Sequence, residues 1–116
     1  MGTITIYHNP RCSKSRQTLA LLNNRGLSPN IVHYLDAPPT AATLKRLLRM
    51  LSMKPRQLLR THEAVYADLG LGDPKLTDDE LIAVMTRHPV LIERPIVEAN
   101  GHAVIGRPPE NVLQIV

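Results

Sequence analysis

The single cysteine of the chain, Cys12, lies in the polar and basic segment HNPRCSKSR, and its thiol is the side chain best suited to covalent chemistry. Cys12 is expected to lie at or just before the start of a helix, where free backbone N–H groups and the positive end of the helix dipole stabilise a thiolate. The cations Arg11, Lys14 and Arg16 add to this effect, and His8 could add charge or accept the thiol proton. The segment therefore predicts a nucleophilic thiolate whose pKa lies below about 8.5, the value of a free thiol.

The same segment predicts an anion site beside the thiol, but its spacing does not match a phosphatase loop or a dithiol motif. Backbone N–H groups and the hydroxyls of Ser13 and Ser15 surround one point and predict a small anion site. Arg16 follows Cys12 by only four residues, so the C-x5-R spacing of a phosphatase loop is absent. Ser15 stands where a CxxC motif has its second cysteine, so an external thiol must resolve any disulfide of Cys12. A buried, inert cysteine is the remaining alternative. An apolar surrounding would favour it, whereas this segment is polar and basic.

Charge is unevenly distributed along the 116 residues, whose formal net charge is +4. Residues 1–60 carry ten Lys or Arg and one acidic residue, whereas residues 61–116 carry four and nine. A basic half is typical of proteins that bind nucleic acid, an acidic partner or an anionic substrate, and a solvated basic surface is the alternative. The chain has three Tyr and no Phe or Trp, which argues against a nucleic-acid partner because bases stack on aromatic side chains.

The composition predicts one globular domain over residues 1–116, with 43% apolar and 21% charged residues. One cysteine excludes an intrachain disulfide and a multi-cysteine metal site, so we expect no metal. No uncharged stretch exceeds ten residues, and a membrane-spanning helix needs about 20. The N-terminal residues lack the order of a signal peptide. We expect a cytoplasmic monomer that does not contact a membrane.

The elements that must position Cys12 begin with a strand, a helix and a second strand. The β-branched and aromatic residues at 3–7 predict the first strand. The helix is expected to begin near residues 13–15 and to end near Gly26, and residues 31–35 predict the second strand. Short connections between the three predict a βαβ unit with a parallel strand pair.

A helical insertion is predicted from about residue 40 to residue 88. Thr40 is a typical N-cap, and leucines recur after it at helical spacing. Shorter helices are predicted at 55–60 and 63–69, and the segment from Thr77 to Glu80 matches a capping box.

The last third of the chain predicts two strands and a helix. The strands at 95–98 and 102–105 flank the Asn100–Gly101 pair, a strong hairpin signal, and a helix follows at 108–115. The order β-α-β, helical insertion, β-β-α predicts an α/β protein with a four-stranded mixed sheet. This is a thioredoxin-like fold, and a cysteine after the first strand and a proline beginning the third, Pro95, agree with it.

Four stretches, in order along the chain, carry a family resemblance. They are ITIYHNPRCSKSRQTL at 4–19, Leu58-Leu59-Arg60, HPVLIERPIV at 88–97 and Gly106-Arg107-Pro108. Together they resemble the glutathione- and glutaredoxin-dependent arsenate reductases of the ArsC family, over essentially the whole chain.

The resemblance implies a role for each matching residue. Cys12 is the nucleophile, and His8 helps to ionise it. Three arginines that spacing alone does not bring together bind the oxyanion: Arg60, Arg94 and Arg107. The residues of the loop around the cysteine are Asn9, Ser13, Ser15 and Arg16. Pro95 is the cis-proline beside the site.

The implied activity is reduction of arsenate to arsenite by the Cys12 thiolate, with glutathione as co-substrate, glutaredoxin as partner and no bound cofactor. One alternative is a related thiol reductase that acts on another oxyanion or on glutathionylated protein. The other is a non-enzymatic regulator of the same fold that binds RNA polymerase. Such regulators usually carry a CxxC switch, and Ser15 in its second position argues against this role.

Overall fold

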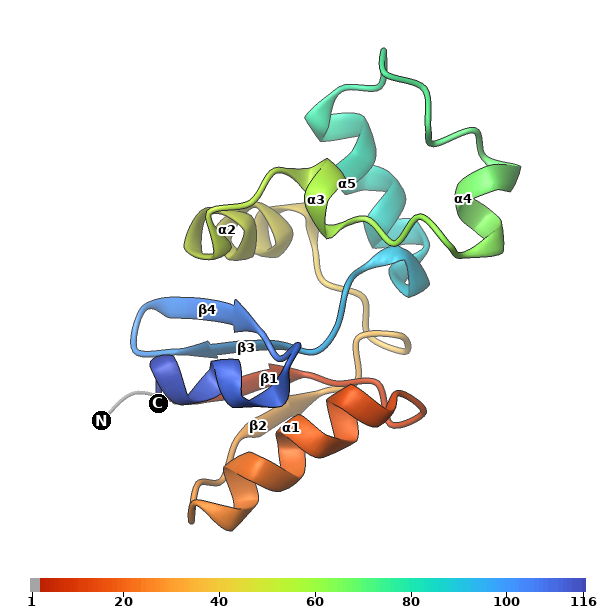
Figure 1. Ribbon diagram of the computed structural model, residues 1–116. Coiled ribbons are helices and arrows are strands. Elements are labelled where there is room, and N and C mark those ends of the chain that lie inside the picture. Colours follow the sequence, from red (N-terminus) through yellow and green to blue (C-terminus); the bar gives the residue numbers. More distant parts are fainter. Residues whose placement is uncertain (1–2) are drawn as a thin grey trace. The chain divides into compact units, whose positions relative to one another are not determined.

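The computed structural model describes residues 3–116, and the chain forms two compact units. Unit 1 consists of the residues up to Ala37 together with Arg94–Val116, and unit 2 consists of Pro38–Glu93 (Figure 1). The helical insertion predicted at about 40–88 lies within unit 2. A single domain over 1–116 stays a prediction, and residues 1 and 2 of it lie outside the described residues.

Unit 1 contains a four-stranded mixed sheet in the order β2-β1-β3-β4. Strand β1 (Thr5–Tyr7) pairs in parallel with β2 (Asn30–Val32) and antiparallel with β3 (Ile96–Ala99), which pairs antiparallel with β4 (His102–Ile105). Helix α1 (Ser13–Asn24) forms the crossover between the two parallel strands. The predicted α/β fold with a four-stranded mixed sheet is therefore confirmed.

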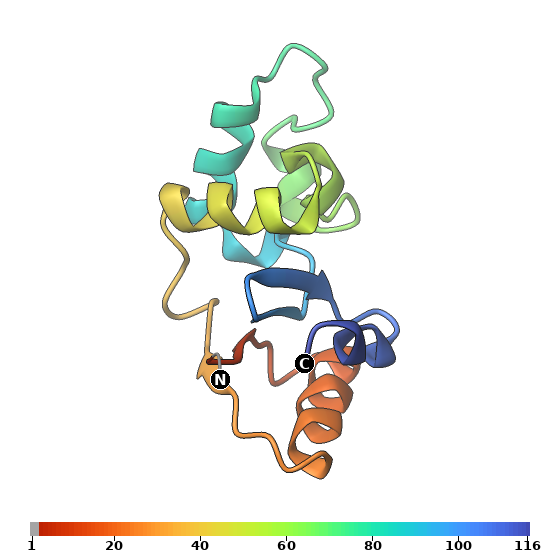
Figure 2. The same cartoon turned by 90° about the vertical axis from the view of Figure 1, so that its left-hand side faces the viewer.

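Helix α1 and the 3-10 helix η2 (Pro109–Gln114) pack side by side on one face of this sheet (Figure 2). The core between them and the sheet contains Ile6, Leu22, Val97 and Val112, all completely buried. Burial of each such side chain stabilises the folded unit by roughly 1.5–3 kcal/mol before entropic costs. This packing holds α1, whose first residue follows Cys12, on the sheet.

The second strand is shorter than the sequence predicts. A strand was expected at 31–35, but β2 ends at Val32. The carbonyl oxygen of His33 accepts hydrogen bonds from the backbone N–H groups of Asp36 and Ala37, at 3.0 and 2.9 Å. These bonds turn the chain, so the second half of the predicted strand is wrong.

The last element also differs from its prediction, because it is a 3-10 helix. Its backbone bonds join residues three apart, from the Asn111 N–H to the Pro108 carbonyl and from the Ile115 N–H to the Val112 carbonyl. The two prolines, Pro108 and Pro109, have no N–H to donate, and 3-10 geometry is common in such short segments.

Unit 2 is helical in the part of the chain that the structure describes. Its elements are α2 (Ala41–Leu51), α3 (Pro55–Leu58), α4 (Ala64–Asp68), α5 (Asp78–Arg87) and the 3-10 helix η1 (Pro89–Leu91).

Both predicted helix caps of unit 2 are confirmed. The Thr40 hydroxyl accepts a hydrogen bond from the Thr43 N–H at 3.2 Å. At α5, the Thr77 hydroxyl accepts from the Glu80 N–H at 3.2 Å, and the Glu80 carboxylate accepts from the Thr77 N–H at 2.9 Å. Helix α5 packs against α2 and α3. The side chains that are at least 99% buried in this unit include Leu44, Leu47, Leu58, Leu81, Met85 and Leu91.

Candidate active site

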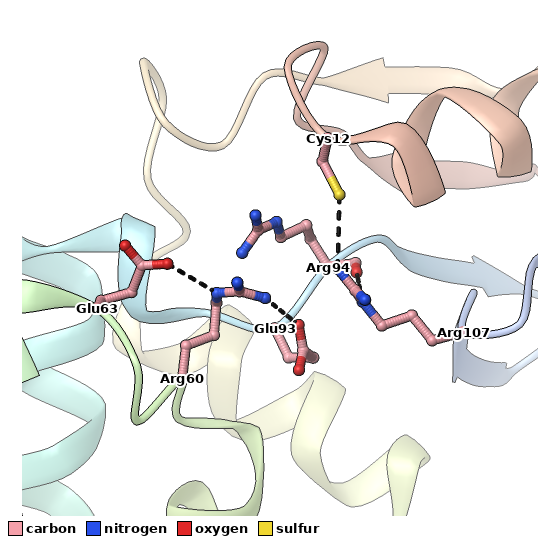
Figure 3. A network of polar contacts seen from close by, with 6 residues as sticks. All are labelled: Cys12, Arg60, Glu63, Glu93, Arg94 and Arg107. Atoms are coloured by element: carbon pink, nitrogen blue, oxygen red, sulfur yellow. Dashed lines mark hydrogen bonds and ion pairs between the residues drawn. The ribbon is translucent and has the colours of Figure 1, made fainter.

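Cys12 occupies the N-cap position of α1, with extended backbone angles (φ −94°, ψ 124°). The helix begins there because the Cys12 carbonyl oxygen accepts the first helical hydrogen bond, from the Arg16 N–H at 3.0 Å. The residue is 7% exposed. An Arg107 Nη2 atom donates to the Cys12 Sγ at 3.6 Å (Figure 3).

The pKa of the Cys12 thiol lies below its ordinary value. Burial raises the pKa, but the backbone N–H groups of Ser15 and Lys14 and the hydrogen bond and positive charge of Arg94 together lower it by more. The helix-start amides act as the sequence predicts, whereas the stabilising charge comes from Arg94. Arg16 is exposed, and its Nη1 donates to the Pro10 carbonyl at 3.0 Å.

His8 is 4% exposed, and its Nδ1 lies 2.7 Å from the hydroxyl oxygen of Ser15. The same hydroxyl, which is completely buried, accepts a hydrogen bond from the Asn9 N–H at 3.0 Å. Burial, then His33 and then Arg16 lower the pKa of His8, so its ring is neutral near pH 7. A neutral ring adds no positive charge to the site, and that His8 helps to ionise Cys12 stays a prediction.

The other loop residues that the resemblance indicates divide into buried and exposed ones. The Asn9 side-chain oxygen accepts from the Arg11 N–H at 3.0 Å, which closes the loop ahead of the cysteine. Ser13 is exposed at the first position of α1. Asn9 and Ser15 therefore shape the loop from inside, while Ser13 and Arg16 face solvent.

Arg94 and Arg107 come from the two sheet ends that meet α1. Arg94 precedes β3, and the Arg94–Pro95 peptide bond is cis, as the resemblance implies. Arg107 follows β4, and its Nε donates to the Arg94 carbonyl oxygen at 2.8 Å (Figure 3). The Gly106 N–H donates to the Pro95 carbonyl at 2.9 Å. The Arg107–Pro108 bond is also cis, which the sequence did not predict.

Thr18 and Gly106 form a close contact that sequence reasoning missed as a structural constraint. A Cβ atom on Gly106 would lie 2.5 Å from Thr18 Oγ1 and 2.9 Å from Pro95 Cγ. The Thr18 hydroxyl donates to the Lys14 carbonyl at 2.8 Å. Glycine at 106 therefore lets the residue before Arg107 approach α1 closely, and the signal for it was present in the Gly106-Arg107-Pro108 stretch.

Arg60 lies in unit 2, between two carboxylates that sequence reasoning did not assign. Its Nε is 3.1 Å from Glu63 Oε2, and its Nη1 is 2.6 Å from Glu93 Oε1 (Figure 3). Burial lowers the pKa of Arg60, but Glu63 and Glu93 raise it by more. The Arg60 N–H donates to the Leu91 carbonyl at 2.7 Å, which fixes its backbone. That Arg60 acts together with Cys12 stays a prediction.

Among residues 3–116, no group of three or more His, Cys, Asp or Glu side chains is arranged to hold a metal ion. The helices of this described part are also too short or too polar to cross a membrane.

The fold and this site define a thioredoxin-like protein with one activated cysteine beside two arginines. A model of the ArsC family matches residues 7–115, and the chain belongs to this family.

Relatives and solved structures cover nearly the whole chain. The uncharacterized protein YfgD of Escherichia coli strain K12 is 54% identical over 114 residues, which are 97% of this chain and 96% of that protein. An arsenate reductase of the same strain is 47% identical over 116 residues, all of this chain and 82% of that protein. The structure of an arsenate reductase from Vibrio cholerae is 52% identical, with a TM-score of 0.96 and 98% coverage of both chains.

Proposed function

We propose that this protein is an arsenate reductase in which Cys12 is the nucleophile and glutathione and glutaredoxin are the reductants. The observation that carries the proposal is the Cys12 thiol of lowered pKa, which accepts a hydrogen bond from one arginine and is stabilised by a second. Relatives that are arsenate reductases, at 47% identity over the whole chain, support the choice of substrate.

Arg94 and Arg107 are suited to an oxyanion because each guanidinium presents a planar fork of donors to two oxygens. A tetrahedral oxyanion beside Cys12 would meet positive charge and the free N–H groups at the start of α1. The resemblance adds Arg60 as the third arginine. In this proposal Arg60 gives up its ion pair with Glu63 or Glu93 and binds the oxyanion instead.

The reaction balances with thiols alone. The Cys12 thiolate attacks arsenic and forms a sulfur–arsenic bond, while one arsenate oxygen leaves as water after taking up protons. The glutathione thiolate then forms a disulfide with the Cys12 sulfur. The sulfur–arsenic bond breaks, and its electron pair reduces arsenic from +5 to +3. Each sulfur loses one electron, arsenite leaves, and a Cys12–glutathione mixed disulfide remains.

An external thiol must restore Cys12, because the chain has one cysteine and Ser15 replaces a resolving one. A glutaredoxin thiolate attacks the glutathione sulfur of the mixed disulfide and releases the Cys12 thiolate. Glutathione and its partner enzymes keep cytosolic thiols reduced, so we place the reaction in the cytoplasm.

A coupled assay of arsenite formation with arsenate, glutathione and glutaredoxin tests the proposal. Wild-type protein should form arsenite, and Cys12→Ser should reduce the rate at least about a thousand-fold, because the hydroxyl of serine is not ionised near neutral pH. Ser28→Ala, at an exposed position of unit 1, is the control and should act as wild type. Arsenite formation by Cys12→Ser at the wild-type rate would overturn the proposal.

A thiol reductase for another substrate is the second candidate. The observation that favours it is that Arg94 and Arg107 both act on the Cys12 sulfur. A guanidinium group matches charge and oxygen geometry, which arsenate shares with other tetrahedral oxyanions. Inactivity with arsenate, together with Cys12-dependent reduction of another oxyanion or of a glutathionylated protein, would select this candidate.

A further inference from the structure

A groove in unit 1 runs between α1 and the segment Pro108–Glu110 at the start of η2. Its volume is about 430 Å³, which lies within the range of small-ligand sites. Lys14, two residues after Cys12, lines it from α1, and Pro108, the residue after Arg107, lines it from the other side. The groove is therefore lined by residues that lie close in sequence to Cys12 and Arg107, and the Arg107 side chain donates to the Cys12 sulfur.

Opposite charges line the two walls of this groove. Lys14 supplies an ammonium group from α1, and Glu110 supplies a carboxylate from η2. Within residues 3–116, neither side chain forms an ion pair or a hydrogen bond. Gln17 adds an amide, and Leu21 and Pro109 add apolar surface. This pattern complements a small zwitterion that carries a carboxylate and an ammonium group close together.

The α1 wall of the groove extends from Lys14 to Asn24, about 15 Å at 1.5 Å per helical residue. Lys14 is at the end of this wall that lies nearer to Cys12 in the sequence.

We propose that this groove binds the γ-glutamyl part of glutathione, with its carboxylate at Lys14 and its ammonium group at Glu110. The glutathione sulfur then points toward Cys12. The inference rests on the proposed use of glutathione as reductant. It adds a recognition site that selects glutathione over thiols without a γ-glutamyl group.

Thiol–disulfide exchange tests the groove without arsenate. The Cys12 thiolate attacks one sulfur of glutathione disulfide, a mixed disulfide forms, and one glutathione thiolate leaves. The probe is glutathione disulfide, and the reference is bis(2-hydroxyethyl) disulfide, which has no charged group. The ratio of the two second-order rate constants reports recognition, because any change in the reactivity of Cys12 affects both.

The variants Lys14→Gln and Glu110→Gln should each lower this ratio up to about five-fold, the size expected for one exposed ion pair. The double variant should lower it further. Lys75→Gln and Asp36→Asn remove the same charges at exposed positions outside the groove and should leave the ratio unchanged.

An unchanged ratio in the double variant would overturn the proposal, and so would equal slowing with both disulfides. The result is separable from the proposed activity. A lowered ratio in a protein that does not reduce arsenate would support the glutathione site in the groove and exclude arsenate as the substrate. Glutathione-dependent arsenate reduction together with an unchanged ratio would support the proposed activity and exclude the groove as the glutathione site.

Discussion

The reactivity of Cys12 depends on a balance between burial, which raises the pKa of its thiol, and three groups that lower it. Two of these are backbone N–H groups of α1, and the third is the Arg94 side chain. Because the pKa is lower in the folded protein, the ionised thiol stabilises the fold at pH values above its ordinary pKa. This contribution is lost as the pH falls through the folded value.

Replacing Arg94 should therefore make Cys12 less acidic. Arg94→Ala should raise the thiol pKa toward the ordinary value of about 8.5, and Arg94→Lys should raise it less because a charge remains. The pH dependence of iodoacetamide alkylation gives the midpoint. Arg25→Ala, at an exposed position of unit 1, is the control. A midpoint for Arg94→Ala equal to that of wild type would refute this account of the pKa.

The buried Ser15 hydroxyl holds the loop through His8 and Asn9. Ser15→Ala leaves the His8 Nδ1 and the Asn9 N–H without this partner, and an unsatisfied buried polar group costs about 1–3 kcal/mol. Urea denaturation should show this loss of unfolding free energy, whereas Ser28→Ala should change it by less than about 0.5 kcal/mol. Equal stabilities of the two variants would show that the Ser15 contacts do not support the loop.

At this scale, sequence reasoning finds what lies within one short segment. Cys12, His8 and Ser15 fall inside nine consecutive residues, so their shared role could be inferred from spacing. Arg94 reaches Cys12 only because β3 pairs with β1. Spacing carries no signal for that pairing, and only the family resemblance indicated Arg94.

At the scale of elements, Arg107 depends on the close approach of the end of β4 to α1. Gly106→Ala would place a Cβ atom against Thr18 and Pro95, and one of the elements must then move. We expect a raised KM for arsenate and a loss of about 1–3 kcal/mol of stability, the usual cost of overpacking. Steady-state kinetics and urea denaturation measure these effects.

Two further variants show whether the close contact is the cause. Gly72→Ala, where the nearest atom is Tyr66 Oη at 3.4 Å, should be tolerated. Adding Thr18→Ala to Gly106→Ala removes the closest clash and should recover part of the lost stability. Wild-type KM and stability in Gly106→Ala alone would contradict the argument.

Local turn chemistry was predictable at this scale, and bonds between distant backbone groups were not. Asn100 and Gly101 have φ values of +55° and +78°, which suit the two-residue hairpin that their types predict. The early end of β2 depends on hydrogen bonds to His33, and the form of η2 depends on bonds three residues apart. Neither has a distinctive residue pattern, so a strand and an ordinary helix were the natural predictions.

At the scale of the whole molecule, the candidate site residues are divided between two units that each have their own core. Cys12, Arg94 and Arg107 belong to unit 1, and Arg60 belongs to unit 2 with its partners Glu63 and Glu93. The βαβ unit and the helical insertion follow from the sequence. The ion pair of Arg60 with Glu93 does not, because it depends on the bridge between Leu59 and Ile92.

This division predicts that Arg60 and Arg94 act differently. Arg60→Ala should raise the KM for arsenate but leave the pKa of Cys12 unchanged, because the groups that lower that pKa all belong to unit 1. Arg94→Ala should change both. Lys45→Ala, which removes an exposed ion pair with Asp79 in unit 2, is the matched control for KM. A wild-type KM for Arg60→Ala would exclude Arg60 from oxyanion binding.

The central claim, that Cys12 transfers electrons to arsenate together with glutathione, is tested most directly by a single turnover without glutaredoxin. Arsenite is quantified, and intact-protein and peptide mass spectrometry counts glutathione bound at Cys12. We predict one arsenite for each Cys12–glutathione disulfide, and neither product from Cys12→Ser. Arsenite without glutathione bound at Cys12, or the adduct at the same rate without arsenate, would contradict the claim.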